Sequence, residues 1–255
     1  MEDIYKKVIE ASRQNLSLVK SISKKAEEEN RIPKIVHFCF VNYSDITELH
    51  LNYIKTWFEV LGDDWIFINW TPENTPPKTI FENMCLNIKN FAYYSDYIRC
   101  SKVYEYGGVY LDCDVNVIKP LDGLLDFDYM FDTVYSNFGE IECASFLAKR
   151  HNCFLYVLKE KYESITTQEF NNSVGKFVAP IFWSNIFYEN NIHVDLKSSY
   201  DIFEYQKRIL LDRDTLYTLD GTVLSCSMNS RRFKNIPDSY FEHTFTSHGF
   251  ETTWN

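Results

Sequence analysis

Two aspartates one residue apart, Asp112 and Asp114, directly follow an apolar stretch in the segment YGGVYLDCDV, residues 106–115. Two carboxylates this close repel each other, and a cation between them removes that cost. Mg²⁺ and Mn²⁺ prefer carboxylate oxygens and often share them with the phosphates of a substrate. The pair therefore predicts a metal–diphosphate site, and a solvated turn is the alternative that the pair alone leaves open.

A second polar pair lies upstream, in the segment YYSDYIRC. Asp96 and Arg99 are three residues apart, so on a helix they share one face. As an exposed ion pair they would contribute only roughly a few tenths of a kcal/mol. The neighbouring tyrosines, Tyr93, Tyr94 and Tyr97, instead indicate burial. Burial favours an arginine directed at a diphosphate, or an aspartate that holds a sugar hydroxyl.

Alternating strands and helices must position these residues. The near-continuous apolar runs KIVHFCFV, WIFINW and VYLDCDVNVI (34–41, 65–70 and 109–118) are typical of strands buried on both faces. Segments 48–64 and 90–108 have the composition of helices, each ending at glycine. This alternation predicts an α/β fold with a mostly parallel sheet flanked by helices. Ligands bind beyond the carboxyl ends of such strands, and alternate residues of an extended chain, such as Asp112 and Asp114, share a side.

Residues 3–29 are predicted to form one N-terminal amphipathic helix, because apolar residues recur at three- and four-residue steps. Docking on the main domain is the simpler interpretation. A peripheral contact with a membrane is the alternative, which the mixed charge of the helix disfavours. We expect two units, the N-terminal helix in residues 1–30 and a single domain in residues 31–255.

The composition limits the class of protein. Of 255 residues, 45% are hydrophobic and 17% aromatic, which suits a folded protein with a substantial core. The net charge of −10 disfavours nucleic acid as a partner. The seven cysteines are scattered without a C-x-x-C pair, so we interpret them as reduced thiols. The first residues lack the apolar core of a signal peptide. We therefore expect a cytoplasmic protein, with a peripheral position at the inner face of the membrane left open.

Three segments resemble the glycosyltransferases that have a DXD-type sugar-binding region: residues 32–41 (IPKIVHFCFV), 93–122 and 243–254 (HTFTSHGFETTW). The group includes bacterial capsular-polysaccharide transferases and Och1-like yeast mannosyltransferases, with the glucosylating clostridial toxins as more distant relatives. The resemblance extends from about Ile32 to about Lys161 and returns weakly at the C-terminal end. It implies a GT-A-like, Rossmann-type fold and transfer of a sugar from a nucleotide-sugar donor to an acceptor hydroxyl.

The resemblance also implies a role for each matching residue. Asp114 would ligate Mn²⁺ or Mg²⁺, and Asp112 would contact the donor and reach the metal through water. Asp96 and Arg99 would bind hydroxyls of the donor sugar, with Arg99 also near the diphosphate. Tyr110 would line the donor pocket. Of these, Asp112, Asp114 and Arg99 are the predicted catalytic residues.

Further roles are implied at both ends of the resemblance. The strand around His37 would form the nucleotide wall, with Phe40 where the family often has Trp, a larger ring for stacking on a base. His243 and His248 would approach the metal or the diphosphate, although they are more loosely spaced than in the family. A polar tail is the alternative for this pair.

The predicted activity is that of a metal-dependent, retaining hexosyltransferase in the synthesis of cell-surface polysaccharide or glycolipid. A UDP-sugar or GDP-mannose would be the donor, and a carbohydrate or a lipid-linked molecule the acceptor. Three alternatives stay open: a secreted effector that glycosylates a protein, a non-catalytic nucleotide-sugar-binding module, and a phosphatase. The last arises because VYLDCDVN also resembles the nucleophile strand of haloacid-dehalogenase-type phosphatases, although it lies unusually deep in the chain.

Overall fold

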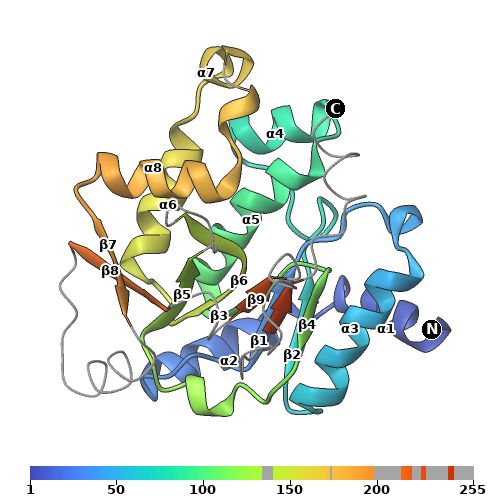
Figure 1. Cartoon of the computed structure of the whole chain (residues 1–255). Helices are drawn as coiled ribbons and strands as arrows, with labels where there is room; N and C mark the ends of the chain where they lie inside the picture. Colours follow the sequence, from blue (N-terminus) through green and yellow to red (C-terminus); the bar gives the residue numbers. More distant parts are fainter. Residues whose placement is uncertain (134–139, 173, 198–213, 220–224, 228–240, 244–255) are drawn as a thin grey trace.

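A mixed seven-stranded sheet forms the centre of the computed structural model, which describes residues 1–133, 140–172, 174–197, 214–219, 225–227 and 241–243 (Figure 1). Its strand order is β2-β1-β3-β6-β5-β8-β7. The strands are β1 (Ile35–Phe38), β2 (Ile66–Asn69), β3 (Gly108–Leu111), β5 (Tyr129–Thr133), β6 (Ile141–Ala148), β7 (His193–Lys197) and β8 (Thr215–Leu219). Only the contacts of β6 with β3 and β5 are antiparallel within this sheet. The predicted mostly parallel sheet is confirmed.

Helices cover both faces of this sheet, as Figure 1 shows. Residues of α1 (Glu2–Ala11) and α3 (Glu48–Leu61) pack in one hydrophobic cluster, with Trp57 completely buried. The other cluster lies beneath α2 (Leu16–Glu28), α4 (Ile80–Asn87), α5 (Phe91–Tyr106), α6 (Cys153–Ser164), α7 (Thr167–Asn172) and α8 (Ala179–Glu189). Three short 3₁₀ turns complete the described elements: Tyr43–Asp45, Asp122–Leu124 and Val174–Lys176. Because successive residues of β1, Ile35 and Val36, enter opposite clusters, the sheet is buried on both faces.

The segment predicted as one strand, 109–118, is two strands in two sheets. β3 ends at Leu111, and β4 (Val115–Val117) joins β10 (Phe241–His243) and β9 (Ser225–Ser227) in a second sheet. Residues 113–114 form a turn, closed by the N–H of Val115 donating to the carbonyl of Asp112 at 3.1 Å. The two aspartates therefore belong to a turn, and the rule for alternate residues of a strand does not apply to them.

The single helix predicted over residues 3–29 is also wrong, because the chain turns between α1 and α2. The Ser12 hydroxyl donates to the carbonyl of Ile9, and the Asn15 side chain caps α2 by accepting from the N–H of Ser17. Such side chains compete with helical hydrogen bonds and favour helix ends. Val8 and Val19 are completely buried, so both helices dock on the rest of the protein. The domain boundary at residue 30 and the membrane contact stay predictions.

Two further expectations concern membranes and thiols. Within the part of the chain that is described, no helix has both the length and the apolar character needed to cross a bilayer. Cys39, Cys85, Cys100, Cys113 and Cys143 form no disulfide, and the last four of these are buried.

Two glycines join α5 to β3 in a space that admits no side chain. Gly107 and Gly108 have φ values of +68° and +118°. A Cβ on Gly107 would lie 2.7 Å from the backbone nitrogen of Arg150, and one on Gly108 would lie 2.6 Å from the carbonyl oxygen of Ile35. This close approach lets β3 lie directly beside β1, and it places Asp112 at the end of a central strand.

Gly108→Ala should lower the free energy of unfolding by about 1–3 kcal/mol from backbone strain alone, with the clash against Ile35 adding to it. Urea denaturation followed by circular dichroism measures this loss. Gly123→Ala is the control, because a Cβ there meets no atom within 4 Å. Equal stability of the two variants would contradict this account of the α5–β3 connection.

Candidate active site

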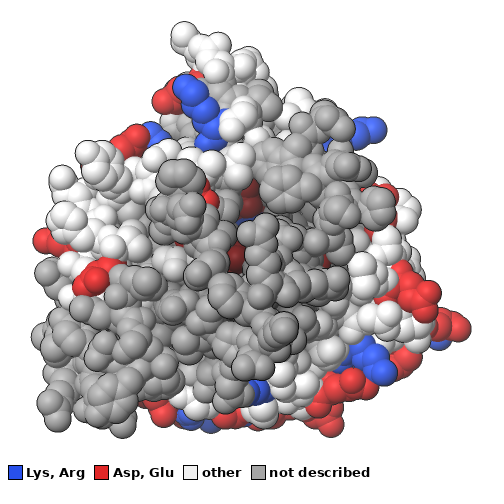
Figure 2. All heavy atoms as spheres, in the orientation of Figure 1, with Lys and Arg blue, Asp and Glu red and all other residues white. Residues whose placement is uncertain are grey.

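The D-x-D turn lies at the carboxyl end of β3, near the middle of the main sheet. The side chain of Asp112 is 28% exposed, and Asp114 is half-buried. The backbone N–H of Asp112 donates to the carbonyl of Ala144 at 2.7 Å, which continues the β3–β6 pairing by one residue. On the face drawn in Figure 2, acidic atoms are visible in a recess near the centre of the molecule. The carboxylates are thus held at an edge of the sheet where a ligand can approach.

A buried arginine joins the two polar pairs that the sequence singled out. The guanidinium of Arg99, whose side chain is 6% exposed, lies 2.9 Å from Asp96 and 3.2 Å from each oxygen of Asp112. It also donates to the carbonyl of Cys143 at 2.7 Å. Asp96 and Asp112 therefore share one cation, and the spacing of the pairs along α5 and β3 brings all three groups together.

The predicted contact of Arg99 with the diphosphate stays a prediction. The guanidinium donates four hydrogen bonds, to Asp112, to the carbonyl of Cys143, and to the carbonyl and hydroxyl of Ser95. It also makes ion-pair contacts with Asp96 and with the second oxygen of Asp112. Its role in this structure is to fix the position of the Asp112 carboxylate.

Tyr110 lies beneath Asp112 and is only 1% exposed. Its hydroxyl donates to Asp112 at 2.8 Å, and its ring centroid lies 4.7 Å from the guanidinium carbon of Arg99. The ring of Phe146 stacks on it from β6. Tyr110 thus supports Asp112 from the core, and its role in lining the donor pocket stays a prediction.

His37 is a core residue. Trp70 donates its indole N–H to Nδ1 of His37 at 3.0 Å, so Nε2 carries the proton and donates to the carbonyl of Gly107 at 2.8 Å. Burial lowers the pKa of His37 to about 4, which keeps the ring neutral. Both ring nitrogens are used and the side chain is completely buried. A contact of this strand with the nucleotide stays a prediction.

Phe40 lies just beyond β1, at the sheet edge that also carries the D-x-D turn. The amide of Asn69 clamps its backbone by accepting from its N–H at 2.7 Å and donating to its carbonyl at 3.1 Å. The ring of Phe40 is half-buried and meets the imidazole of His50 edge-on at 5.4 Å. Stacking of Phe40 on a nucleotide base stays a prediction, and its position is compatible with it.

The sequence analysis did not identify two residues of this region. Asn69 holds the backbone of Phe40, and a polar amide inside the apolar run WIFINW was the available signal. Burial lowers the pKa of His50, and the negative charge of the nearby Asp114 partly opposes this shift. Nothing in the local sequence of His50 indicates this proximity, because it depends on how α3 packs.

Burial raises the pKa of Asp96 to about 7, even though the guanidinium of Arg99 opposes the shift. The negative charge of Asp112 adds to the increase. Asp96 is 5% exposed, so its charged form has little solvent to stabilise it. Two acids that share one buried cation readily keep a proton on one of them, and the more buried acid is Asp96.

The donor set suits a metal that is bound together with a substrate. The carboxylate of Asp112 bonds to Arg99 and Tyr110 and is 28% exposed, and Asp114 follows in the same turn. Within the described residues no cluster of three or more acidic, histidine or cysteine side chains could hold a metal alone. Mg²⁺ is commonly held by one or two carboxylates, substrate phosphates and water. Asp112 and Asp114 fit that arrangement.

The two predicted C-terminal histidines have different outcomes. The backbone of His243 pairs with Val115 across β10 and β4, so it lies beside the residue that follows Asp114. His248 lies outside the described residues. An approach of either imidazole to the metal stays a prediction.

Comparison with known proteins decides the family. Residues 13–131 match the family model described as "Glycosyltransferase sugar-binding region containing DXD motif". The match covers a little under half of the chain, so this region is similar to that family. The match contains Asp96, Arg99, Asp112 and Asp114, and it starts earlier and ends earlier than the predicted range from Ile32 to Lys161. The predicted family and enzyme class are confirmed over this region, which favours a glycosyltransferase over a phosphatase.

One curated relative and two solved structures give further comparisons. Inositol phosphoceramide mannosyltransferase 1 of Schizosaccharomyces pombe (strain 972 / ATCC 24843) is 30% identical over 109 residues, which cover 38% of this chain and 33% of the relative. The solved "PaToxG Glycosyltransferase" has a TM-score of 0.50 at 12% identity, covering 72% of this chain and 80% of that one. A glycosyltransferase involved in glycosylation of the major capsid of PBCV-1 has a TM-score of 0.47 at 15% identity, covering 86% and 97%.

These comparisons have two consequences. The likeness to the first solved structure agrees with the observed sheet, and the GT-A-like fold is confirmed. The match with the curated relative spans about a third of that protein, so its activity is not transferred with the alignment.

The raised pKa of Asp96 predicts a pH-dependent stability. Between about pH 4 and pH 7 the folded protein keeps a proton on Asp96 that the unfolded chain has released. The free energy of unfolding should therefore fall as the pH rises through this range and level off above it. Urea denaturation at several pH values measures the slope, and Asp96→Asn should make it shallower.

Asp128→Asn, at a half-exposed carboxylate paired with Lys149, should leave the slope unchanged. An unchanged slope in Asp96→Asn would refute this assignment.

Proposed function

We propose that the protein transfers a sugar from a nucleotide-sugar to an acceptor hydroxyl, with Mn²⁺ or Mg²⁺ held by Asp114 directly and by Asp112 through water. One observation carries the proposal: Arg99 and Tyr110 fix the Asp112 carboxylate at the carboxyl end of β3. A rigid pair of carboxylates at that edge suits a cation that also binds a diphosphate. The family of residues 13–131 supports the same reaction class.

The protein's own groups prepare the site before the donor arrives. A bound divalent cation would neutralise the charge that develops on the departing nucleotide diphosphate. Arg99 holds Asp112 with one hydrogen bond and a second ion-pair contact, which restrain the carboxylate before a ligand binds. Tyr110 adds another hydrogen bond from below. Such preorganisation is a large electrostatic contribution to catalysis, because no reorganisation is needed as charge develops.

Asp96 is the proposed acceptor of a hydrogen bond from a donor sugar hydroxyl. It lies on α5, 2.9 Å from Arg99, on the same side of the helix as the D-x-D turn. Arg99 therefore connects Asp96, proposed to hold the sugar, with Asp112, proposed to reach the metal through water. This connection would fix the distance between the two parts of the donor.

For the donor we propose GDP-mannose first and UDP-sugars as the alternative. The relative's printed name, a mannosyltransferase that acts on inositol phosphoceramide, favours a mannosyl donor and a lipid-linked acceptor. A carbohydrate acceptor and a role in cell-surface polysaccharide or glycolipid synthesis are compatible with the same site. A retaining outcome follows the resemblance of the motif block, residues 93–122, to retaining transferases.

Asp114→Asn should lower the Mn²⁺-dependent hydrolysis of GDP-mannose or UDP-glucose by at least about 100-fold, because the amide is a far weaker ligand for a hard cation. Release of nucleoside diphosphate measures the rate, and a thermal shift with donor and Mn²⁺ measures binding. Asp126→Asn is the matched control, at a carboxylate that is 76% exposed and paired with Arg31.

Two results would count against the proposal. Full turnover with EDTA present would exclude the metal. A donor-induced thermal shift without turnover across a panel of acceptors would indicate a binding module instead.

A further inference from the structure

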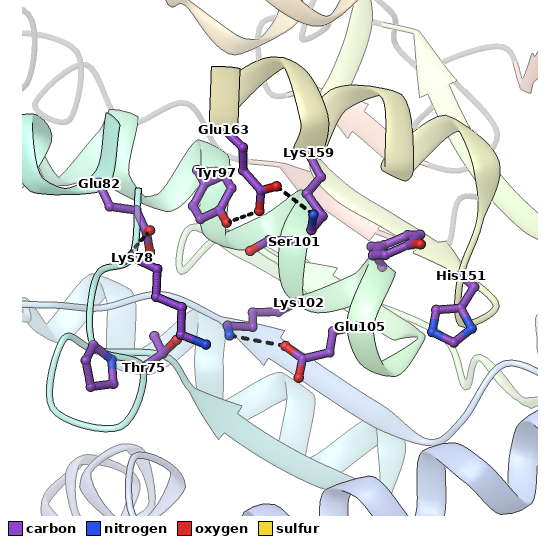
Figure 3. Close-up of a pocket in the computed structure, with 12 residues that line it drawn as sticks. Thr75, Lys78, Glu82, Tyr97, Ser101, Lys102, Glu105, His151, Lys159 and Glu163 are labelled. Carbon is purple, nitrogen blue, oxygen red and sulfur yellow. Dashed lines mark hydrogen bonds and ion pairs between the residues drawn. The ribbon is translucent and has the colours of Figure 1, made fainter. Parts of the chain in front are cut away.

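Figure 3 shows a cavity that is lined by one side of α5. Tyr97, Ser101 and Glu105 line it at four-residue steps of the helix, whereas Asp96 and Arg99 project from the opposite side. The loop of residues 75–78 and helix α6 complete its walls. No part of the proposed transferase site uses it.

The size of this cavity limits its ligand. Its volume is about 190 Å³, whereas pockets for drug-sized molecules begin at about 300 Å³. A nucleotide-sugar is therefore too large. A single small group, such as one phosphate, is of suitable size.

Two of its three glutamates are already satisfied by protein donors. Glu163 accepts from the hydroxyl of Tyr97 and from Lys159, each at 2.8 Å. Glu82 accepts from the backbone N–H groups of Lys78 and Thr79, each at 2.9 Å, and so caps α4. These carboxylates do not offer a charge to a new cation.

The remaining charged groups are mostly basic. The side chain of Lys102 is 12% exposed, and its ammonium lies 4.7 Å above the ring of Trp70 and 3.4 Å from Glu105. Burial lowers the pKa of Lys102, and the positive charge of Lys78 acts in the same direction. His151, at the far end of the cavity, is bound to Glu27 at 3.1 Å.

Lys78 supplies the decisive observation. No ion pair or hydrogen bond of its ammonium group is found among the residues that the structure describes. Figure 3 shows the side chains of Lys78 and Lys102 directed into the same part of the cavity. Two like charges that converge in a small cavity leave a position that an anion would stabilise.

We propose that this cavity binds a single phosphate group between the ammonium groups of Lys78 and Lys102. The group is either free phosphate or the phosphomonoester end of a larger molecule, such as a soluble metabolite or a lipid headgroup, whose remainder stays in solvent. Tyr97 and Tyr104 offer apolar walls for the part next to the phosphate. The ligand would sit on the side of α5 opposite Asp96 and Arg99, separate from the donor.

Calorimetric titration with inorganic phosphate, at constant ionic strength and with EDTA present, tests the proposal. Lys78→Gln and Lys102→Gln should each weaken binding about tenfold, the loss expected for one charge-assisted hydrogen bond. Lys24→Gln is the control, at a lysine of α2 whose side chain is 73% exposed. Lys78 is exposed, so Lys78→Gln should fold normally. It therefore tests the proposal even if Lys102→Gln is destabilised by the loss of the Lys102 contact with the Trp70 ring. Asp114→Asn should bind phosphate as the wild type does, which separates this cavity from the donor site.

Two further arms identify the source of the phosphate. Tighter binding of glycerol 3-phosphate than of phosphate would indicate a soluble monoester. Co-sedimentation with phosphatidic acid vesicles, but not with phosphatidylcholine vesicles, would indicate a lipid headgroup. Lys78→Gln should then abolish the co-sedimentation. No measurable phosphate binding by the wild type, or equal binding by Lys78→Gln, would overturn the proposal.

Discussion

The buried guanidinium of Arg99 is the group on which the geometry of the candidate site depends. It connects α5, β3 and β6 through Asp96, Asp112 and the carbonyl of Cys143. Removing such a cation from water costs several kcal/mol, and the cost is offset only when every donor finds a partner. Here Arg99 donates four hydrogen bonds and makes ion-pair contacts with Asp96 and Asp112, which restrain the arrangement. The arginine is better understood as the support of a carboxylate than as a ligand for the substrate.

Short-range patterns predicted the parts of this site, and long-range packing decided how the parts work. The spacing of Asp96 and Arg99 on a helix, and of Asp112 and Asp114 after a strand, could be read from neighbouring residues. The partners of Arg99 could not, because its shortest hydrogen bond is to the carbonyl of Cys143, 44 positions away. The same holds for His37, whose partners Trp70 and Gly107 come from β2's end and from the α5–β3 connection. An apolar run that contains a histidine gives no sign of whether that histidine faces a ligand or the core.

The fold was predictable where hydrophobic runs are long and was missed where a few polar contacts intervene. The alternation of buried strands and helices gave the right sheet type. The break between β3 and β4 depends on one turn and on α3, where Trp57 donates to the carbonyl of Val115 and Thr56 accepts from the N–H of Val117. Such contacts override the tendency of an apolar segment to continue as one strand. The same limitation explains why α1 and α2 looked like one helix.

Because β3 and β4 lie in different sheets, the chain crosses from one sheet to the other within the D-x-D segment itself. Asp112 directly follows β3 of the main sheet, and Asp114 directly precedes β4 of the smaller one. The distance between the two carboxylates therefore depends on how the two sheets are aligned. The backbone of residues 241–243, far away in sequence, belongs to that alignment through its pairing with β4. A shift of the smaller sheet would change the distance between the two carboxylates. A cation bound by Asp114, and by Asp112 through water, would oppose that shift.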